Sequence, residues 1–309
     1  MTETTPIERV LVVGAGAMGA QIAMVAALAG REVRLHDVDA TLAEQAVGRL
    51  RERLDAQVAK GRRTADDVAA AFGRLSVADD LDADAADVDL VIEAVVERLP
   101  VKRDLFARLD ALCPERTILA SNSSSFVPSS MASATERPDR FVNLHFFNPA
   151  LVMKCVEVVR GPASSDATVG TALRFVDALD KTPVVLDREI PGFVANRLLG
   201  AVRDEAIGLL EGGYADVEAI DTAARTALGH PMGPFELMDL TGIDIGYLTK
   251  TARFEESGDR ADAPSATVAA LVEKGDLGRK TGRGFYVYDD GGHRLAPAEL
   301  PESPELKGK

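Results

Sequence analysis

The chain has 309 residues, enough for two domains of ordinary size with a substantial core. Hydrophobic residues make up 46% and charged residues 27%, as in globular proteins, and a formal net charge of −14 disfavours binding to nucleic acid or an anionic membrane. The only cysteines, Cys113 and Cys155, exclude a disulfide framework and lack metal-ligand spacing, so no metal is expected. Neither a signal peptide at residues 1–9 nor an apolar stretch of roughly 18 residues is present, so we expect a cytoplasmic protein without a membrane span.

The first elements along the chain are predicted to be a strand, a glycine loop, a helix and a second strand. Residues 10–13 form a short apolar run, typical of a strand buried on both faces, and the loop GAGAMG (14–19) follows directly. A helix-forming stretch over 20–29 ends at a glycine, and a strand over 32–36 delivers Asp37 about 20 residues beyond the loop. This order is that of a dinucleotide-binding unit.

Each part of this stretch has a physical role in such a unit. The first glycine permits a tight turn, the second lets the backbone approach a pyrophosphate, and the third lets helix pack on strand, while the helix N-terminus offers N–H groups to phosphate. Asp37 would bind the adenosine ribose and repel a 2′-phosphate, which predicts NAD rather than NADP. The alternative is a nucleotide-free α/β unit with a glycine turn. The cofactor contacts expected here are Gly14, Gly16, Ala17, Met18, Gly19 and Asp37.

Strands and helices continue to alternate as far as about residue 186. A charged helical pair is predicted over 40–72, with Gly61 near its turn. The further predicted strands are 88–95, 117–121, 141–147, 155–159 and 183–186, with helices at 101–112 and 165–179. This rhythm predicts an α/β fold with a Rossmann-type, doubly wound and mainly parallel sheet. The last strands have shorter connections, which are compatible with antiparallel pairing.

The pattern changes near Pro191-Gly192, beyond which helical periodicity dominates. The predicted helices are 193–211, 216–228 with Asp216 as N-cap, 233–248 and 266–274. We therefore predict a dinucleotide-binding domain over 1–188, an all-α C-terminal domain over 189–288 and a loose tail over 289–309.

One pair of residues indicates proton-transfer chemistry. LHFFNP (144–149) places His145 at the end of a predicted strand, where ligand sites of α/β proteins lie, and Glu157 follows on the next strand. A neutral imidazole can take a hydroxyl proton while a carboxylate fixes its tautomer. The alternative is a satisfied core histidine beside an unrelated glutamate.

Together these motifs resemble the short-chain L-3-hydroxyacyl-CoA dehydrogenase family, which includes bacterial 3-hydroxybutyryl-CoA dehydrogenases. The matching segments, in family order, are GAGAMGAQIA (14–23), EAVVE (93–97), SNSSS (121–125), LHFFNP (144–149), VEVV (156–159), PGFVANR (191–197), GHPMGPFELMDLTG (229–242) and GRKTGRGFYVY (278–288). The resemblance implies a Rossmann-type domain followed by a helical domain for substrate binding and dimerisation. It also implies NAD as cofactor, an acyl-CoA substrate and a homodimer.

The resemblance also assigns site residues. His145 would be the catalytic base and Glu157 its orienting partner, while Ser124 and Asn196 would contact the substrate oxygen. Further cofactor contacts implied by the family are Glu97, Lys102, Ser124, Asn148 and Lys280, and Lys60 is a candidate for a CoA phosphate. Ser124 could instead serve a turn, Asn196 could be a surface amide, and Lys60 could belong to a solvated face.

The reaction that the resemblance implies is the reversible oxidation of an L-3-hydroxyacyl-CoA, short-chain substrates such as 3-hydroxybutyryl-CoA being favoured, to the 3-ketoacyl-CoA. One alternative is a dehydrogenase of the same fold that acts on a free hydroxy acid such as L-gulonate or carnitine. Another is a non-catalytic NAD-binding protein of the crystallin kind. Ser123 stands where the family often has threonine, and Ala150-Leu151-Val152 replaces a proline-containing continuation, which leaves the acyl length open.

Overall fold

The computed structural model describes residues 6–300 and divides into two compact units, Met1–Val194 and Ala195–Lys309. The division falls after Val194, whereas the sequence suggested residue 188. No helix within the described range is both long enough and apolar enough to cross a membrane.

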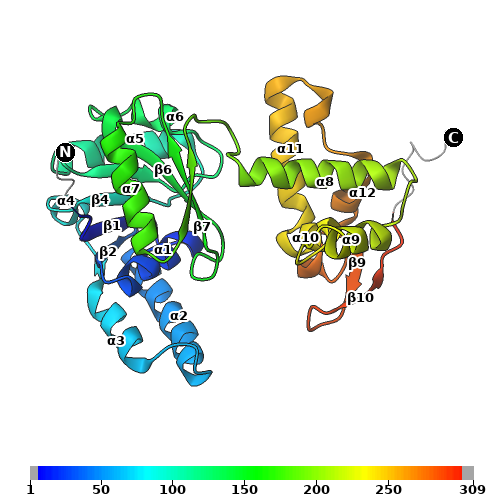
Figure 1. The fold of residues 1–309 in the computed structure, drawn as a ribbon, viewed down its shortest axis with the longest axis horizontal. Helices are drawn as coiled ribbons and strands as arrows, with labels where there is room; N and C mark the ends of the chain where they lie inside the picture. The colour runs from blue at the N-terminus through cyan, green and yellow to red at the C-terminus, as the bar shows by residue number, and fades with distance from the viewer. Residues whose placement is uncertain (1–5, 301–309) are drawn as a thin grey trace. The chain divides into compact units, whose positions relative to one another are not determined.

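The first unit is built on one eight-stranded sheet with the order β3-β2-β1-β4-β5-β6-β7-β8 (Figure 1). The strands are β1 (Arg9–Val13), β2 (Glu32–His36), β3 (Leu75–Ala78), β4 (Leu90–Glu93), β5 (Ile118–Ser121), β6 (Phe141–Phe146), β7 (Cys155–Arg160) and β8 (Thr182–Leu186). Neighbouring strands pair in parallel except β6 and β7, which are antiparallel. The predicted Rossmann-type, mainly parallel sheet is confirmed.

Helices cover both faces of this sheet. They are α1 (Ala17–Leu28), α2 (Ala40–Ala59), α3 (Ala65–Arg74), α4 (Leu81–Ala85), α5 (Leu99–Leu112), α6 (Pro128–Ala132) and α7 (Asp166–Ala178), with a 3-10 turn η1 (Pro138–Arg140). Alternate residues of β1 enter different apolar clusters: Val10 and Val12 join the cluster of α1 and α7, and Leu11 and Val13 join that of α5. A strand buried on both faces therefore requires an uninterrupted apolar run.

The strand order creates a switch point beside β1. Strand β1 pairs with β2 on one side and with β4 on the other side. In such sheets a crevice opens beyond the carboxyl ends of the two strands where the winding reverses, and ligands bind there. The glycine loop follows β1 at this edge of the sheet.

The second unit consists of helices and one hairpin. The helices are α8 (Ala195–Glu211), α9 (Val217–Thr226), α10 (Pro234–Thr241), α11 (Ile243–Ser257) and α12 (Ala266–Lys274), with 3-10 turns η2 (Arg260–Asp262) and η3 (Arg279–Thr281). Asp216 caps α9, as predicted, by accepting a hydrogen bond from the Ala219 amide at 2.8 Å. The single helix expected over 233–248 is wrong, because Gly242 has a φ of +97° and separates α10 from α11.

The expected loose tail is also different in part. Strand β10 (Arg294–Pro297) pairs antiparallel with β9 (Tyr286–Tyr288), and the Ala298 amide donates to the Phe285 carbonyl. This pairing gives residues 294–298 a regular place against the domain. Residues 301–309 of the predicted tail lie outside the described range.

Two buried carboxylates connect the helices of the second unit to the hairpin. Asp239 of α10 accepts hydrogen bonds from the Phe285 and Tyr286 amides and from the Tyr288 hydroxyl, all at 2.9 Å. Asp221 of α9 accepts the Tyr286 hydroxyl at 2.9 Å. Burial raises the pKa of Asp239 to about 6 and also raises the pKa of Asp221.

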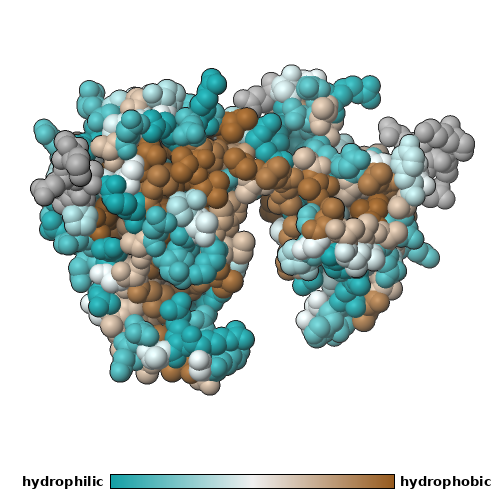
Figure 2. Space-filling model, viewed as in Figure 1, coloured by the Kyte–Doolittle hydropathy of each residue, from teal (hydrophilic) through white to brown (hydrophobic). Residues whose placement is uncertain are grey.

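The same unit exposes apolar side chains. Figure 2 shows hydrophobic residues gathered over α8. Exposed large apolar residues of α8, α10 and α11 are Leu198, Val202, Leu240, Ile245, Leu248 and Phe254.

Candidate active site

The glycine loop has the shape that a pyrophosphate site needs. Gly14 has a φ of +106°, and a Cβ there would lie 2.5 Å from the Ala94 carbonyl oxygen. At Gly19 a Cβ would lie 1.8 Å from the Gly14 oxygen, whereas at Gly16 it would meet nothing within 4 Å. The loop is therefore tightly packed on β4 and α1 but open at Gly16, beside the first turn of α1. That turn carries no acidic side chain, so its N–H groups can receive an anion.

Asp37 is joined directly to this loop. One carboxylate oxygen accepts a hydrogen bond from the Ala15 amide at 2.7 Å, and the other accepts from the Asp39 amide at 3.2 Å. The half-buried carboxylate thus stands at the end of β2, next to the open face of the loop. A ribose diol is a suitable donor to such an acceptor, and a 2′-phosphate would be repelled.

His145 and Glu157 form a buried pair at the carboxyl end of β6. The antiparallel register places them opposite each other, and His145 Nδ1 lies 2.8 Å from Glu157 Oε2. Glu157 Oε1 accepts a hydrogen bond from the Val194 amide at 2.9 Å. Because an ionised carboxylate only accepts, it favours the tautomer of a neutral imidazole in which Nδ1 carries the hydrogen and Nε2 holds the lone pair.

Two aromatic rings pack near the imidazole. The Phe147 ring centroid lies 4.5 Å from that of His145, and the Phe193 centroid lies 5.4 Å away. Phe193 is fully buried and has a φ of +49°, an unusual conformation for a residue other than glycine. The backbone beside it supplies the Val194 amide to Glu157, so this conformation occurs directly at the His145–Glu157 pair.

Glu97 and Lys102 meet where β4 ends and α5 begins. Lys102 Nζ lies 3.0 Å from Glu97 Oε2, and the Ser125 amide donates to Glu97 Oε1 at 3.1 Å. The Ser123 hydroxyl donates to the same oxygen. Burial opposes ionisation of Glu97, but Lys102 and these hydrogen bonds outweigh it, and the pKa of Glu97 lies below its usual value.

The other predicted residues of the first unit lie on its surface. Ser124 is exposed in the turn after β5, with its Oγ 3.5 Å from that of Ser125. Asn148 is exposed after β6, and its Oδ1 lies 3.5 Å from the Gln21 side-chain amide. Lys60 is exposed at the C-cap of α2.

Asn196 and Lys280 belong to the second unit. Asn196 is half-buried at the second residue of α8. Lys280, in η3, donates to both carboxylate oxygens of Asp244 at 2.6 Å. This ion pair holds the lysine against the start of α11.

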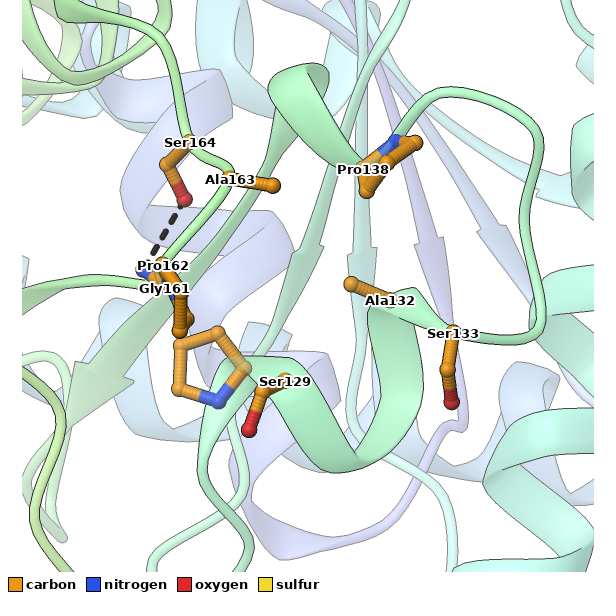
Figure 3. A pocket seen from close by; sticks show the side chains of 9 residues that line it. Ser129, Ala132, Ser133, Pro138, Gly161, Pro162, Ala163 and Ser164 are labelled. Carbon is orange, nitrogen blue, oxygen red and sulfur yellow. Dashed lines mark hydrogen bonds between the residues drawn. The ribbon is translucent and has the colours of Figure 1, made fainter.

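One hollow elsewhere in the first unit is unsuited to a charged ligand. It measures about 200 Å³ and lies among α6, η1 and the turn after β7, with Pro128, Ala132 and Pro138 on its walls (Figure 3). None of its lining residues, all of which the structure describes, is charged. The Ser164 hydroxyl that borders it is engaged by the Gly161 amide at 2.9 Å.

Sequence reasoning missed several residues that support the predicted ones. Glu93 contacts Lys102, Asp244 contacts Lys280, and Phe193 packs on His145. Glu93 is the first residue of the EAVVE segment, so a signal was present. Among the side chains that the structure describes, no group of three or more His, Cys, Asp or Glu residues is arranged to hold a metal ion.

Both units of the chain match known proteins of a single family. Residues 9–190 match the family model described as "3-hydroxyacyl-CoA dehydrogenase, NAD binding domain", and residues 192–288 match the model of the C-terminal domain. A probable 3-hydroxybutyryl-CoA dehydrogenase of Bacillus subtilis (strain 168) is 40% identical over 284 residues, which are 92% of this chain and 98% of that protein. The mitochondrial hydroxyacyl-coenzyme A dehydrogenase of Homo sapiens is 42% identical over 288 residues, 91% of each chain.

A solved structure agrees along the same length. The (S)-3-hydroxybutyryl-CoA dehydrogenase of Ralstonia eutropha has a TM-score of 0.85 and 36% sequence identity to this chain. The match covers 92% of this chain and 100% of that one. The likeness therefore extends over both units.

Proposed function

This chain belongs to the 3-hydroxyacyl-CoA dehydrogenase family, and we propose that it catalyses the reversible, NAD-dependent oxidation of an L-3-hydroxyacyl-CoA to the 3-ketoacyl-CoA. A short-chain substrate such as 3-hydroxybutyryl-CoA is favoured by the names of the bacterial relatives. The observation that carries the proposal is the buried His145–Glu157 pair beside a dinucleotide-binding crevice.

The glycine loop and its neighbours fit a bound NAD. Gly14, Gly16, Ala17, Met18 and Gly19 would hold the pyrophosphate, and Asp37 the adenosine ribose. Glu97, Lys102 and Ser124 would serve the nicotinamide end, while Asn148 and Lys280 are further cofactor contacts that the family implies. The open space at Gly16 and the acid-free first turn of α1 support this assignment. When bound, NAD supplies the hydride acceptor at C4 of its nicotinamide ring.

His145 acts as the general base in the direction of oxidation. Its Nε2 takes the proton of the substrate 3-hydroxyl as the C3–H bond breaks, and Glu157 stabilises the imidazolium that results. In reduction the imidazolium returns the proton to the carbonyl oxygen. Ser124 and Asn196 contact that oxygen, and Lys60 contacts a phosphate of CoA.

The test is NADH oxidation with acetoacetyl-CoA, beside free acetoacetate and a His145→Gln variant. Fast turnover of the CoA ester, lost in the variant while NADH still binds, supports both substrate class and base. Turnover of acetoacetate alone would favour a dehydrogenase of free hydroxy acids. Turnover of neither, with NADH bound, would contradict the proposed activity and favour the non-catalytic alternative.

The proposal includes a homodimer formed through the second unit. The exposed apolar side chains of α8, α10 and α11 support it, since exposed apolar surface of this kind favours burial against a partner. Light scattering at micromolar concentration should give twice the chain mass, and the mass of one chain would contradict the dimer. The cytoplasmic location stays a prediction that cell fractionation can test.

A further inference from the structure

A fully buried carboxylate lies beneath the proposed cofactor site and takes no part in the mechanism above. Glu93 is the last residue of β4 and has no exposed surface. Its Oε1 lies 2.6 Å from Lys102 Nζ and accepts the Val95 amide at 2.7 Å. Its Oε2 accepts the Ser121 hydroxyl at 2.6 Å. The Glu93 carboxylate thus accepts from three donors, all of them groups of the first unit.

Burying these two charges carries a desolvation cost, so the ion pair is by itself weak evidence of a stabilising role. Lys102 is 1% exposed and lies in the first turn of α5, where the positive end of the helix dipole disfavours a cation. Removing both charges of such a pair in favour of apolar groups is often neutral or stabilising, since each ion loses its hydration. An ion pair retained at this cost indicates a role in positioning.

The position of the pair joins it to the dinucleotide crevice. Glu93 pairs in register with Val13, which immediately precedes the glycine loop. The next residue, Ala94, is the one whose carbonyl oxygen packs against Gly14. The carboxylate thus lies at the switch point of the sheet, beneath the place where the loop would hold a pyrophosphate.

A chain of contacts leads from this buried carboxylate to the surface. Lys102 Nζ touches Glu93 on one side and Glu97 on the other, at 2.6 and 3.0 Å. Glu97 is 37% exposed and Lys102 only 1%, so Glu97 is the more accessible of the two to a ligand. Ser121 contacts the chain at its buried end, where its Oγ donates to Glu93. The same Oγ accepts the Ser123 amide at 3.1 Å, and the Ser123 hydroxyl donates to Glu97 at the other end.

We infer that Glu93 is a positioning residue for NAD binding: it fixes the Lys102 ammonium, which in turn holds the Glu97 carboxylate toward the cofactor. Glu93 itself touches no ligand, since its oxygens are engaged within the fold. This inference rests on the proposed NAD site and adds the residue that orders it. Loss of Glu93 should weaken cofactor binding while leaving the His145–Glu157 pair unchanged.

The experiment measures the Kd of NADH for Glu93→Gln by the fluorescence of bound NADH, and separately kcat and KM with acetoacetyl-CoA. We expect the Kd and KM for NADH to rise about tenfold or more, because the neutral amide of glutamine no longer offers a negative charge to the Lys102 ammonium. The kcat at saturating NADH and the KM for acetoacetyl-CoA should stay within about twofold of wild type.

Asp110→Asn is the matched control. Asp110 lies near the other end of α5 and forms a largely buried ion pair with Arg137 at 2.6 Å. This variant should lower Tm without changing the Kd of NADH. A double variant of Glu93→Gln with Lys102→Met should bind NADH no more weakly than Lys102→Met alone, since Glu93 acts through that lysine.

Ser121→Ala provides a milder change if Glu93→Gln does not fold, and it should raise the Kd in the same direction. An unchanged Kd in the folded variants, with only Tm lowered as in the control, would overturn the inference. The inference would also be overturned if Glu93→Gln weakened NADH binding by the same factor in the Lys102→Met background as in the wild type. Failure of the proposed function is distinguishable in the wild-type protein. If the NAD site is wrong, the wild type binds no NADH, and if only the activity is wrong, it binds NADH without turning over acetoacetyl-CoA.

Discussion

At the scale of single residues, Glu157 determines which nitrogen of His145 can accept a proton. Replacement by glutamine lets a side-chain amide donate to Nδ1, which favours the tautomer whose Nε2 already carries hydrogen. We expect Glu157→Gln to lower kcat by about 10²–10⁴-fold, the range that a positioned general base contributes. Steady-state kinetics with acetoacetyl-CoA measure this loss, and a fluorescence titration should show NADH affinity little changed.

His145→Gln is the comparison for that variant. Two residues that act as a unit are not additive, so the double variant should be no slower than His145→Gln alone. If Glu157→Gln kept kcat within about threefold of wild type, then Glu157 would not act through the imidazole.

Asp37 should decide the choice between NADH and NADPH. Its carboxylate accepts the Ala15 amide and stands beside the open loop, so a 2′-phosphate would meet a negative charge. In Asp37→Ala we expect the KM for NADH to rise about tenfold or more, and the preference to move toward NADPH, because charged hydrogen bonds are lost. Asp37→Asn keeps the size and an acceptor oxygen, and should relax the preference with a smaller rise in KM. An unchanged NADH/NADPH ratio in Asp37→Ala would contradict the assignment.

The sequence predicts those residue pairs that are set by strand register or by a local motif. His145 and Glu157 lie opposite each other because a short connection forces β6 and β7 to pair antiparallel. It does not predict that Lys102 is buried, since a lysine in a charged helix is normally solvated. Nor does the sequence predict the role of its partner Glu93. That role depends on Ser121 of a neighbouring strand, which only the fold brings close to Glu93.

At the scale of elements, substitutions at two glycines of the loop should affect NADH binding and folding separately. Gly16 has ordinary extended backbone angles, and a Cβ added there would meet nothing within 4 Å, so Gly16→Val should fold with Tm nearly unchanged but bind NADH much more weakly. Gly19→Ala should lower Tm, because its Cβ would meet the Gly14 carbonyl oxygen at 1.8 Å. Thermal unfolding and NADH titration of the two variants measure both effects. Equal NADH affinity in Gly16→Val and wild type would contradict the pyrophosphate site.

Elements with a long periodic pattern were predicted, and short ones or breaks were not. Strand β3 has only four residues and follows α3 without a turn, so no punctuation marks it in the sequence. The break at Gly242 falls within an apolar helical pattern, and only the positive φ of that glycine turns α10 into α11. Strand β10 is fully exposed and gains its order from pairing with β9, which no local pattern indicates.

At the scale of the whole molecule, the buried carboxylates Asp221 and Asp239 of the second unit have raised pKa values, whereas the pKa values of Glu97 in the first unit and Glu236 in the second are lowered. In the first unit the pKa of Glu97 is lowered, despite burial, by Lys102 and hydrogen bonds. Its stabilising effect is present above the unfolded pKa and is lost as pH falls through the folded value. In the second unit burial raises the pKa of both Asp221 and Asp239. Their effect on stability therefore has the opposite sign.

For Asp239 the sign follows from a folded pKa of about 6 against a reference value of 3.8. Between these values the folded state holds the proton more tightly than the unfolded state, so stability is greatest below the lower value and is lost as pH rises through about 6. We expect the free energy of unfolding of the second unit to fall by a few kcal/mol from about pH 4 to about pH 7, at roughly 1.4 kcal/mol per unit of pKa shift.

The chain offers a selective probe of that change. It has no tryptophan, and its four tyrosines, Tyr214, Tyr247, Tyr286 and Tyr288, all belong to the second unit. Urea unfolding followed by tyrosine fluorescence at a series of pH values therefore reports on this unit alone. Asp239→Asn should be less stable than wild type, because an amide replaces the acceptor of three hydrogen bonds, and its stability should depend less steeply on pH. A wild-type unfolding free energy that rises steadily from pH 4 to pH 7 in the tyrosine signal would show that the buried carboxylates are held ionised by their donors, against the direction expected from burial.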